Sequence, residues 1–368
     1  MNKLNLLILC AQGGVAGSTY SISYLANGLA KLGHNVHLAL IKDSFLDALV
    51  DETLVKKLYV PFKGKLDKDT RKQIAELIDQ ENIQIANAQS SNDRYLVPII
   101  NLKRKKKVIV VQTRRQKPKD MTAINQYFQN IFNNHFSDYL VTVSHELKRI
   151  FETRGIKSSK IKVIHNGTPT EQYKEDDALL AQLKKKVGFK EDDIVIGCTA
   201  RYKNQPHLVK ALQYLPKEWK VLYVGLDAKA YQERFPDEPP MLDVPQEVKA
   251  LGIVENKAEV IQYYRMMNVN ILPSTMDGFG LTLVESMAMG TPVVGTNFAG
   301  IKDVIQHEET GLLYEDEDYQ GLAEQIKRAI LDEALRAKLI TNGRKAALEK
   351  FSIENTISNY EAFFQSII

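Results

Sequence analysis

The sequence predicts an α/β protein with two domains. Short apolar runs, typical of buried strands, alternate along the chain with segments whose apolar residues recur at helical spacing. Such alternation is typical of parallel sheets with helices on both faces. The chain has 368 residues, enough for two domains of ordinary size with separate cores. Ligands of such sheets bind beyond the carboxyl ends of the strands, so the loops there are the expected place for a functional site.

The composition indicates a globular protein that folds in water. Hydrophobic residues make up 44% of the chain and charged residues 26%. A net charge of +4 is mild for this length and does not favour a nucleic-acid-binding protein. Cys10 and Cys198 lie in apolar runs without metal-ligand neighbours, which indicates buried thiols in a reducing compartment.

The first ten residues are predicted to form a strand rather than a signal peptide. Their apolar run is short, and Gly13-Gly14 follows in place of a small-residue cleavage site. No run approaches the length of a membrane span. We therefore expect a cytoplasmic protein.

Each half of the chain contains strands and helices in alternation. In the first half, Gly13 and Gly14 lie in the loop between the first strand and a helix. The first half has predicted helices at 20–32, 68–81, 94–102 and 145–155, and later strands at 36–41, 83–86, 108–112 and 138–143. The second half has predicted strands at 194–200, 220–225, 269–272 and 292–294, and helices at 179–187, 283–290 and 319–350.

A glycine-rich turn follows the strand at 269–272. Gly278 and Gly280 allow the backbone to approach a ligand closely, and the free amides of the next helix point toward it. Phosphates bind at such places. Thr282 and Glu285 have the spacing of a capping box, which predicts that the helix opens near residue 283; in that interpretation Glu285 is a cap alone.

The same turn carries a family resemblance. Asp277 and Glu285 stand eight residues apart around Gly-Phe-Gly-Leu-Thr-Leu-Val, which resembles the acidic pair of family 4 glycosyltransferases, retaining enzymes of GT-B architecture. The resemblance implies two Rossmann-like domains that face each other across a cleft. It implies an acceptor-side domain over 1–170, completed by 352–368 crossing back onto it, and a nucleotide-sugar-binding domain over 171–351.

The resemblance also implies a role for each residue of the turn. The sugar would contact Asp277, Phe279 and Gly280, with Gly278 giving close approach. Leu281 and Thr282 would contact the diphosphate, and Glu285 the ribose. The first acid is Asp where the family usually has Glu, so this carboxylate is one methylene shorter.

Two cations follow the strand at 194–200. Relatives place a Gly-Arg pair there and a Lys a few residues later, both holding the donor diphosphate. Arg201 matches this pattern, whereas Lys203 comes sooner, in a shorter loop. Such cations stabilise the negative charge that grows on a departing diphosphate. We therefore predict Asp277, Arg201 and Lys203 as the catalytic residues, with no protein nucleophile, no metal and no cofactor.

The acceptor side is predicted in the first domain. In the family, the loop equivalent to Gly13 and Gly14 contacts the donor phosphate or the acceptor, and by this resemblance we predict Gly13 and Gly14 as donor-binding residues. Arg114 and Arg115 lie at a strand end where many relatives carry a histidine. An arginine there suits a phosphate on the acceptor, and a solvated loop charge is an equal alternative.

Basic and aromatic residues cluster around this region. Basic residues gather at 103–107 and 114–119. The next segment has an apolar stripe at helical spacing that consists of Met121, Ile124, Phe128, Ile131, Phe132 and Phe136. The stripe favours a core-facing helix. The alternative is peripheral docking on anionic lipid at the inner membrane face.

The sequence thus predicts a retaining glycosyltransferase. It would move a hexose-type sugar from a nucleotide-diphosphate sugar to a glycan or lipid-linked acceptor, in bacterial cell-envelope polysaccharide or lipopolysaccharide biosynthesis. One alternative is a GT-B nucleotide-sugar epimerase, although the loop at 112–116 lacks the His or Glu expected of an acid/base residue. Another is a nucleotide-sugar-binding subunit with impaired catalysis.

Overall fold

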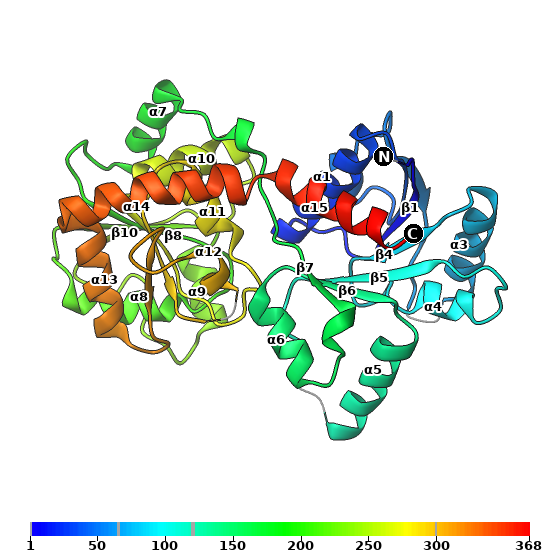
Figure 1. Cartoon of the computed structure of the whole chain (residues 1–368). Helices are drawn as coiled ribbons and strands as arrows, with labels where there is room; N and C mark the ends of the chain where they lie inside the picture. The colour runs from blue at the N-terminus through cyan, green and yellow to red at the C-terminus, as the bar shows by residue number, and fades with distance from the viewer. Residues whose placement is uncertain (1, 65–66, 119–121, 299) are drawn as a thin grey trace. The chain divides into compact units, whose positions relative to one another are not determined.

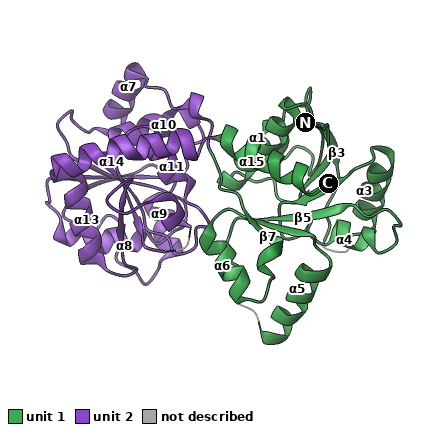
Figure 2. Cartoon of the chain, in the orientation of Figure 1, with its two compact units in different colours: residues 1–167, 353–368 green, residues 168–352 purple. Residues whose placement is uncertain are grey.

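A computed structural model describes residues 2–64, 67–118, 122–298 and 300–368. The chain forms two compact units (Figure 2). Unit 1 contains Met1–Gly167 and Ile353–Ile368, and unit 2 contains Thr168–Ser352. Each unit is an α/β domain with one parallel sheet, as the sequence predicts (Figure 1).

Unit 1 has a seven-stranded sheet in the order β3-β2-β1-β4-β5-β6-β7. The strands are β1 Asn5–Cys10, β2 Asn35–Leu40, β3 Lys56–Tyr59, β4 Ile85–Ala88, β5 Ile109–Arg114, β6 Tyr139–Thr142 and β7 Ile161–Val163. The helices are α1 Gly17–Lys31, α2 Phe45–Leu49, α3 Lys68–Gln80, α4 Leu96–Asn101, α5 Ala123–His135, α6 His145–Thr153 and α15 Ile353–Ser366. The strand order reverses between β1 and β4, which is where doubly wound sheets bind ligands.

The core of unit 1 follows from the alternation of side chains along β1. Leu6 and Ile8 point into a cluster that includes residues of α1 and α15, whereas Leu7 and Leu9 point into a cluster on the opposite face that includes residues of α3. Both faces of a parallel sheet are covered in this way, so its strands are almost continuously apolar.

The C-terminal helix α15 belongs to unit 1. It lies beside α1 (Figure 1), and a Cβ atom added to Gly28 of α1 would come within 2.1 Å of Ile357. The imidazole of His34 lies 3.2 Å from a carboxylate oxygen of Glu361. The predicted return of the chain end to the first domain is therefore confirmed.

Unit 2 has a six-stranded sheet in the order β10-β9-β8-β11-β12-β13. The strands are β8 Val195–Thr199, β9 Lys220–Val224, β10 Glu247–Ala250, β11 Val269–Leu272, β12 Val293–Thr296 and β13 Leu312–Tyr314. The helices are α7 Asp177–Val187, α8 Gln205–Ala211, α9 Ala228–Arg234, α10 Lys257–Met266, α11 Leu281–Ala288, α12 Ile301–Val304, α13 Tyr319–Leu331 and α14 Glu333–Lys345. The order reverses between β8 and β11.

Three edge strands, β3, β10 and β13, were not predicted, and two of these, β3 and β10, share one property. They lie at the ends of their sheets, and none of their residues is buried. Edge strands commonly carry charged residues that discourage pairing with other chains, so the apolar pattern used to predict strands is missing there. No helix among the described residues has both the length and the apolar character needed to cross a bilayer.

Candidate active site

The loops that carry the predicted donor-binding residues meet at the switch point of unit 2. Arg201 and Lys203 follow β8, and Asp277 follows its neighbour β11. The amide of Asn204 donates a hydrogen bond of 2.8 Å to the carbonyl of Pro273, which joins the two loops. Open parallel sheets bind ligands at such a point.

Lys203 and Asp277 form an ion pair at this point. The ammonium nitrogen of Lys203 lies 2.7 Å from Oδ1 of Asp277, so the shortened loop still brings the lysine to the acid. The other carboxylate oxygen, Oδ2, is buried and has no hydrogen-bond partner among the described residues. A buried acceptor without a partner costs about 1–3 kcal/mol, and a ligand hydroxyl would offset that cost.

The backbone around Asp277 is fixed by further hydrogen bonds. The amide of Asp277 donates to the hydroxyl of Ser274 at 3.2 Å, and the amide of Gly300 donates to the carbonyl of Asp277 at 3.2 Å. A Cβ atom added to Gly300 would lie 1.9 Å from the carbonyl oxygen of Gly278. The loop after β11 and the loop after β12 therefore touch through their backbones. This contact holds Asp277 in place.

The predicted capping box is wrong. The N-cap of α11 is Gly280, in the left-handed conformation with φ 84° and ψ 53°, and no side chain caps the helix. Leu281 and Thr282 therefore occupy the first turn, where backbone amides have no partner within the helix. The helix dipole and these amides favour an anion at this end.

Glu285 does not act as a cap. Its Oε1 accepts a hydrogen bond of 2.5 Å from the ammonium of Lys257, and its Oε2 accepts one of 2.8 Å from the hydroxyl of Tyr264. The Glu285 side chain is 13% exposed. An ionised carboxylate has roughly four acceptor positions, so these two donors leave capacity for ligand hydroxyls.

Phe279 is part of the core of unit 2. Its side chain is 3% exposed, and its ring packs edge-on against Phe351 with centroids 5.4 Å apart. Any contact of this residue with a donor therefore falls to its backbone. The packing of Phe279 against Phe351 also holds the glycine-rich turn against the C-terminal end of unit 2.

In unit 1 the predicted glycines differ in their surroundings. A Cβ atom added to Gly13 would lie 2.5 Å from the Cβ atom of Ser44, so the chain needs glycine there for close packing. Gly14 has open space at that position, and its carbonyl accepts a hydrogen bond of 2.6 Å from the hydroxyl of Thr19 in α1. The loop from β1 to α1 is thus held by contacts within unit 1.

Arg114 and Arg115 are not solvated loop charges, so that alternative is wrong. Nε and Nη2 of Arg114 and Nε of Arg115 are buried without a hydrogen-bond partner among the described residues. Both arginines line a cavity of about 520 Å³ in unit 1. Burial lowers the pKa of the Arg114 guanidinium to about 9, with a further contribution from the neighbouring charge of Arg94.

Sequence reasoning missed Arg94 and Asp93, which lie beside this cavity. Arg94 lines it, and Asp93 is fully buried next to it. The available signal was the polar run 89–94 directly after an apolar strand, at the carboxyl end of the sheet.

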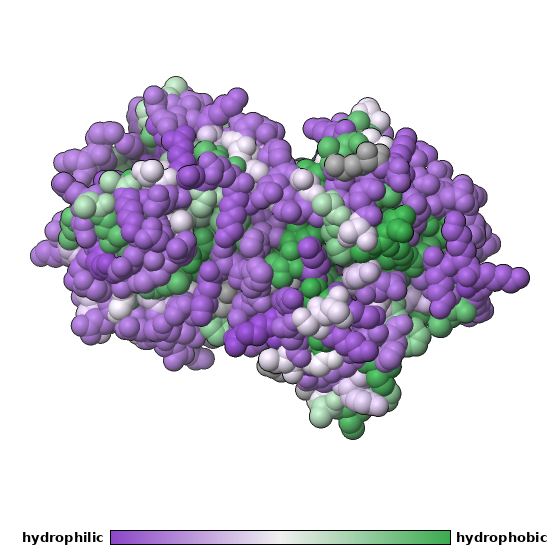
Figure 3. Space-filling view, in the orientation of Figure 1, coloured by the Kyte–Doolittle hydropathy of each residue, from purple (hydrophilic) through white to green (hydrophobic). Residues whose placement is uncertain are grey.

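The interpretation of the α5 stripe as core is wrong for three of its members. Ile124, Phe128 and Phe136 are 69%, 63% and 42% exposed, and Tyr127 between them is 63% exposed. Met121 lies outside the described residues. Hydrophobic residues gather at the free end of α5 (Figure 3).

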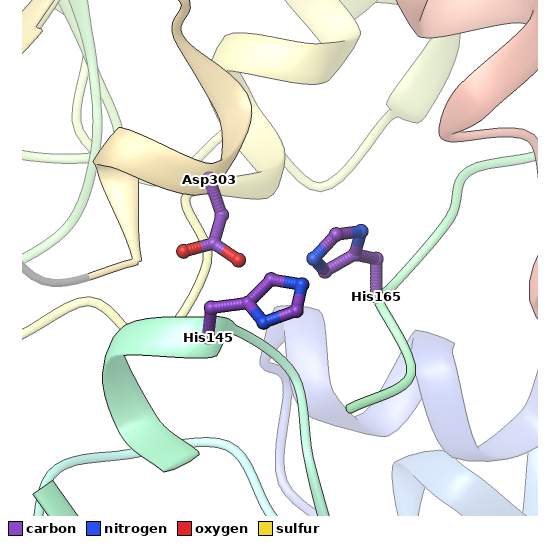
Figure 4. A group of neighbouring side chains, drawn as sticks. All are labelled: His145, His165 and Asp303. Atoms are coloured by element: carbon purple, nitrogen blue, oxygen red, sulfur yellow. The ribbon is translucent and has the colours of Figure 1, made fainter. Parts of the chain in front are cut away.

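Two histidines of unit 1 come together near the end of the sheet (Figure 4). His145 begins α6, and His165 follows β7; their ring centroids lie 5.6 Å apart at an angle of 73°. The hydroxyl of Thr356 in α15 donates a hydrogen bond of 3.0 Å to the carbonyl of His165. Figure 4 also labels Asp303, which lies in the first turn of α12 in unit 2.

Comparison with known proteins agrees with the geometry. The family model for Glycosyltransferase Family 4 matches residues 15–172, and the model for Glycosyl transferases group 1 matches residues 181–346. An N-acetyl-alpha-D-glucosaminyl L-malate synthase from Bacillus anthracis is 26% identical over 383 aligned positions, which cover 100% of this chain and 98% of that protein. The capsular polysaccharide biosynthesis glycosyltransferase CapM from Staphylococcus aureus is 28% identical and covers 62% of each chain.

A solved structure shows the same fold. Anabaena Alr3699/HepE in complex with UDP-glucose superposes with a TM-score of 0.82 at 20% identity, over 99% of this chain and 100% of that one. The chain therefore belongs to glycosyltransferase family 4, as the acidic pair indicated. It is a glycosyltransferase of GT-B fold that transfers a sugar from a nucleotide sugar.

Proposed function

We propose that the chain transfers a hexose-type sugar with retention of its anomeric configuration, and that unit 2 binds the donor through Arg201, Lys203, Asp277 and Glu285. The observation that carries this proposal is the Lys203–Asp277 ion pair, in which Oδ2 of the acid is buried and unpartnered. A sugar hydroxyl would donate to that oxygen. The lysine beside it would face the diphosphate.

The reaction breaks the bond between the anomeric carbon and the diphosphate oxygen. Negative charge grows on the diphosphate, where Arg201, Lys203 and the first-turn amides of α11 stabilise it. The acceptor oxygen forms the new bond to the anomeric carbon, and its proton passes to the leaving phosphate. Attack from the same face as departure retains the configuration, without a protein nucleophile.

We propose a UDP-linked donor. The fold of this chain resembles that of HepE, whose structure holds UDP-glucose, and this likeness supports testing that nucleotide first. A thermal-shift screen would compare UDP-, GDP-, ADP- and CDP-linked sugars, with UDP-glucose and UDP-N-acetylglucosamine among them. We expect the largest stabilisation with UDP-linked sugars, and no stabilisation by any of them would contradict the proposal.

Turnover then separates the alternatives. A glycosyltransferase releases UDP and, with its acceptor, forms a glycoside whose anomeric configuration is read by NMR. An epimerase would return a changed nucleotide sugar without releasing UDP. A binding subunit would be stabilised by the donor and would release nothing.

We propose a glycan or lipid-linked acceptor of the cell envelope. The likeness to CapM, which is named for capsular polysaccharide biosynthesis, supports this proposal. A second candidate acceptor is a small hydroxy acid, because the relative named an L-malate synthase aligns over almost the full length of both chains. Transfer assays with L-malate and with a lipid-linked acceptor distinguish the two.

We also propose that α5 docks on anionic lipid. Exposed Ile124, Tyr127 and Phe128 would enter the interface, and the basic run 103–107 would contact headgroups at about 1 kcal/mol for each basic residue. The protein should cosediment with phosphatidylglycerol-containing vesicles at low salt. Phe128→Ser should weaken this binding, whereas Leu331→Ser, at a residue 60% exposed in unit 2, should not. Absence of cosedimentation would refute docking.

A further inference from the structure

We propose that the cavity of unit 1 binds an anionic group of the acceptor, a phosphate or a carboxylate, and that Arg94, Arg114 and Arg115 recognise it. This inference rests on the proposed function only in treating the ligand as the acceptor. The binding of an anion by the cavity is a separate physical claim, and it can be tested without catalysis.

The cavity lies where the strand order of unit 1 reverses. Its walls include Cys10 at the end of β1, the segment 89–91 after β4, and Thr113 at the end of β5. It therefore opens at the carboxyl ends of β1, β4 and β5, at the switch point between β1 and β4. A volume of about 520 Å³ is within the range of small-molecule sites.

Among the described residues, the charges that line the cavity are all positive. Its described lining residues include Arg94, Arg114, Arg115 and Lys117, and no described lining residue is Asp or Glu. No salt bridge in the described part of the chain involves Arg94, Arg114 or Arg115. A cluster of cations whose charge is not neutralised by salt bridges stabilises an anion that enters it.

The guanidinium groups also have unused hydrogen-bond donors. Nε of Arg94, Nε and Nη2 of Arg114, and Nε of Arg115 are buried without a partner among the described residues. Within the described ranges, these guanidinium groups make one hydrogen bond, from Nη1 of Arg115 to Oε1 of Gln89 at 2.6 Å. Planar guanidinium groups bind carboxylate and phosphate oxygens in pairs of parallel hydrogen bonds, so either anion would satisfy these donors.

One buried acid, Asp93, interacts with the three arginines, and its single charge offsets only part of theirs. The carboxylate of Asp93 accepts hydrogen bonds from the amide of Ala11 at 3.1 Å, the amide of Ser90 at 3.0 Å and the hydroxyl of Ser90 at 2.6 Å. Asp93 therefore fastens the loop after β4 to the end of β1. It is a positioning residue, because it holds the backbone that carries Arg94.

Titration calorimetry on the full chain tests the inference. The probes are L-malate, inorganic phosphate and neutral L-malamide. We expect L-malate or phosphate to bind and L-malamide not to bind, with the tighter anion showing which group the acceptor carries. Binding of neither anion, or equal binding of L-malamide, would overturn the inference.

Variants locate the binding. Arg94→Gln and Arg114→Gln should lower the affinity for the anion at least tenfold. Lys117→Gln, at an exposed position, should lower this affinity less. Arg149→Gln is the matched control, because Arg149 is a surface arginine of unit 1 paired with Glu146. Equal anion binding by Arg94→Gln, Lys117→Gln and Arg149→Gln would overturn the inference. The melting temperature and UDP binding of each variant show whether it has folded.

The two proposals fail in different ways. If UDP binds and the anions do not, the donor assignment stands and this inference is wrong. If the anions bind and UDP does not, the cavity binds anions and the donor assignment is wrong. In a transfer assay, Arg94→Gln should raise the KM of the acceptor at least tenfold and leave the KM of the donor unchanged.

Discussion

The ammonium of Lys203 lies 2.7 Å from Oδ1 of Asp277, although 74 residues separate the two in the sequence. The ion pair joins the loop after β8 to the loop after β11, across the reversal of strand order. It orients the carboxylate so that one oxygen is held, while the other is buried without a hydrogen-bond partner among the described residues. The pair therefore couples the proposed sugar contact to the proposed diphosphate contact.

Replacing Lys203 should slow turnover more than it weakens donor binding. Lys203→Met removes a cation that acts on charge formed in the transition state, at a cost of about 3 kcal/mol, or ~100-fold in kcat. Steady-state kinetics with the preferred donor checks this. Asp277→Asn should also lower kcat, and the double variant should lose less than the two single losses together, because the residues act as a pair. Strict additivity would contradict the coupling.

Glu285 should act mainly on donor affinity. Glu285→Gln replaces a charged hydrogen-bond acceptor by a neutral one. The free energy of donor binding should weaken by about 1.5–3 kcal/mol, which corresponds to a donor KM at least tenfold higher. Tyr264→Phe removes one of the two protein donors to that carboxylate and should have a smaller effect. Donor titrations of both variants give the comparison. An unchanged donor affinity in Glu285→Gln would show that this carboxylate serves only the packing of α10 against α11.

The left-handed Gly280 should resist substitution. Gly280→Ala forces a side chain into a backbone with φ 84° and brings a Cβ atom to 3.1 Å from Leu272. The left-handed conformation alone costs about 1–2 kcal/mol for a residue other than glycine. Thermal and urea unfolding should show this loss. Gly14→Ala is the control, since nothing lies within 4 Å of its added Cβ, and equal losses in both variants would contradict the explanation.

Asp93 should make stability depend on pH. Burial raises its pKa from 3.8 to about 6, so the folded chain holds this proton more tightly than the unfolded chain. The resulting stabilisation is present below pH 4 and is lost as pH rises through 6, with a size of about 3 kcal/mol. The unfolding free energy of the wild type minus that of Asp93→Asn should fall between pH 4 and pH 7. Glu52→Gln, an exposed position of unit 1, should show no such trend.

Much of the candidate donor site could be predicted from the sequence. Arg201, Lys203, Asp277 and Glu285 lie in loops and a helix start that local patterns reveal, and parallel sheets place such loops at one edge. The prediction of a capping box was wrong because the spacing of Thr282 and Glu285 is only a local signal. It was overridden by the left-handed Gly280 and by Lys257 and Tyr264, which come from elsewhere in unit 2.

The acceptor side was harder to predict, because burial is a property of the folded chain. Arg94, Arg114 and Asp93 resemble ordinary loop residues until β1, β4 and β5 bring them around one cavity. The prediction that the apolar stripe of α5 is buried was wrong for a related reason. Helical spacing identifies an apolar face, but it does not say whether the protein covers that face, and Ile124 and Phe128 remain exposed.

Unit 2 is proposed to bind the diphosphate of the donor through the loop after β8. Titration calorimetry of UDP with the wild type and with Arg201→Ala tests it most directly, with Arg149→Ala as a surface control. We predict that the wild type and the control bind UDP alike and that Arg201→Ala binds at least tenfold more weakly while melting at a similar temperature. Equal binding of UDP by all three proteins would contradict the account.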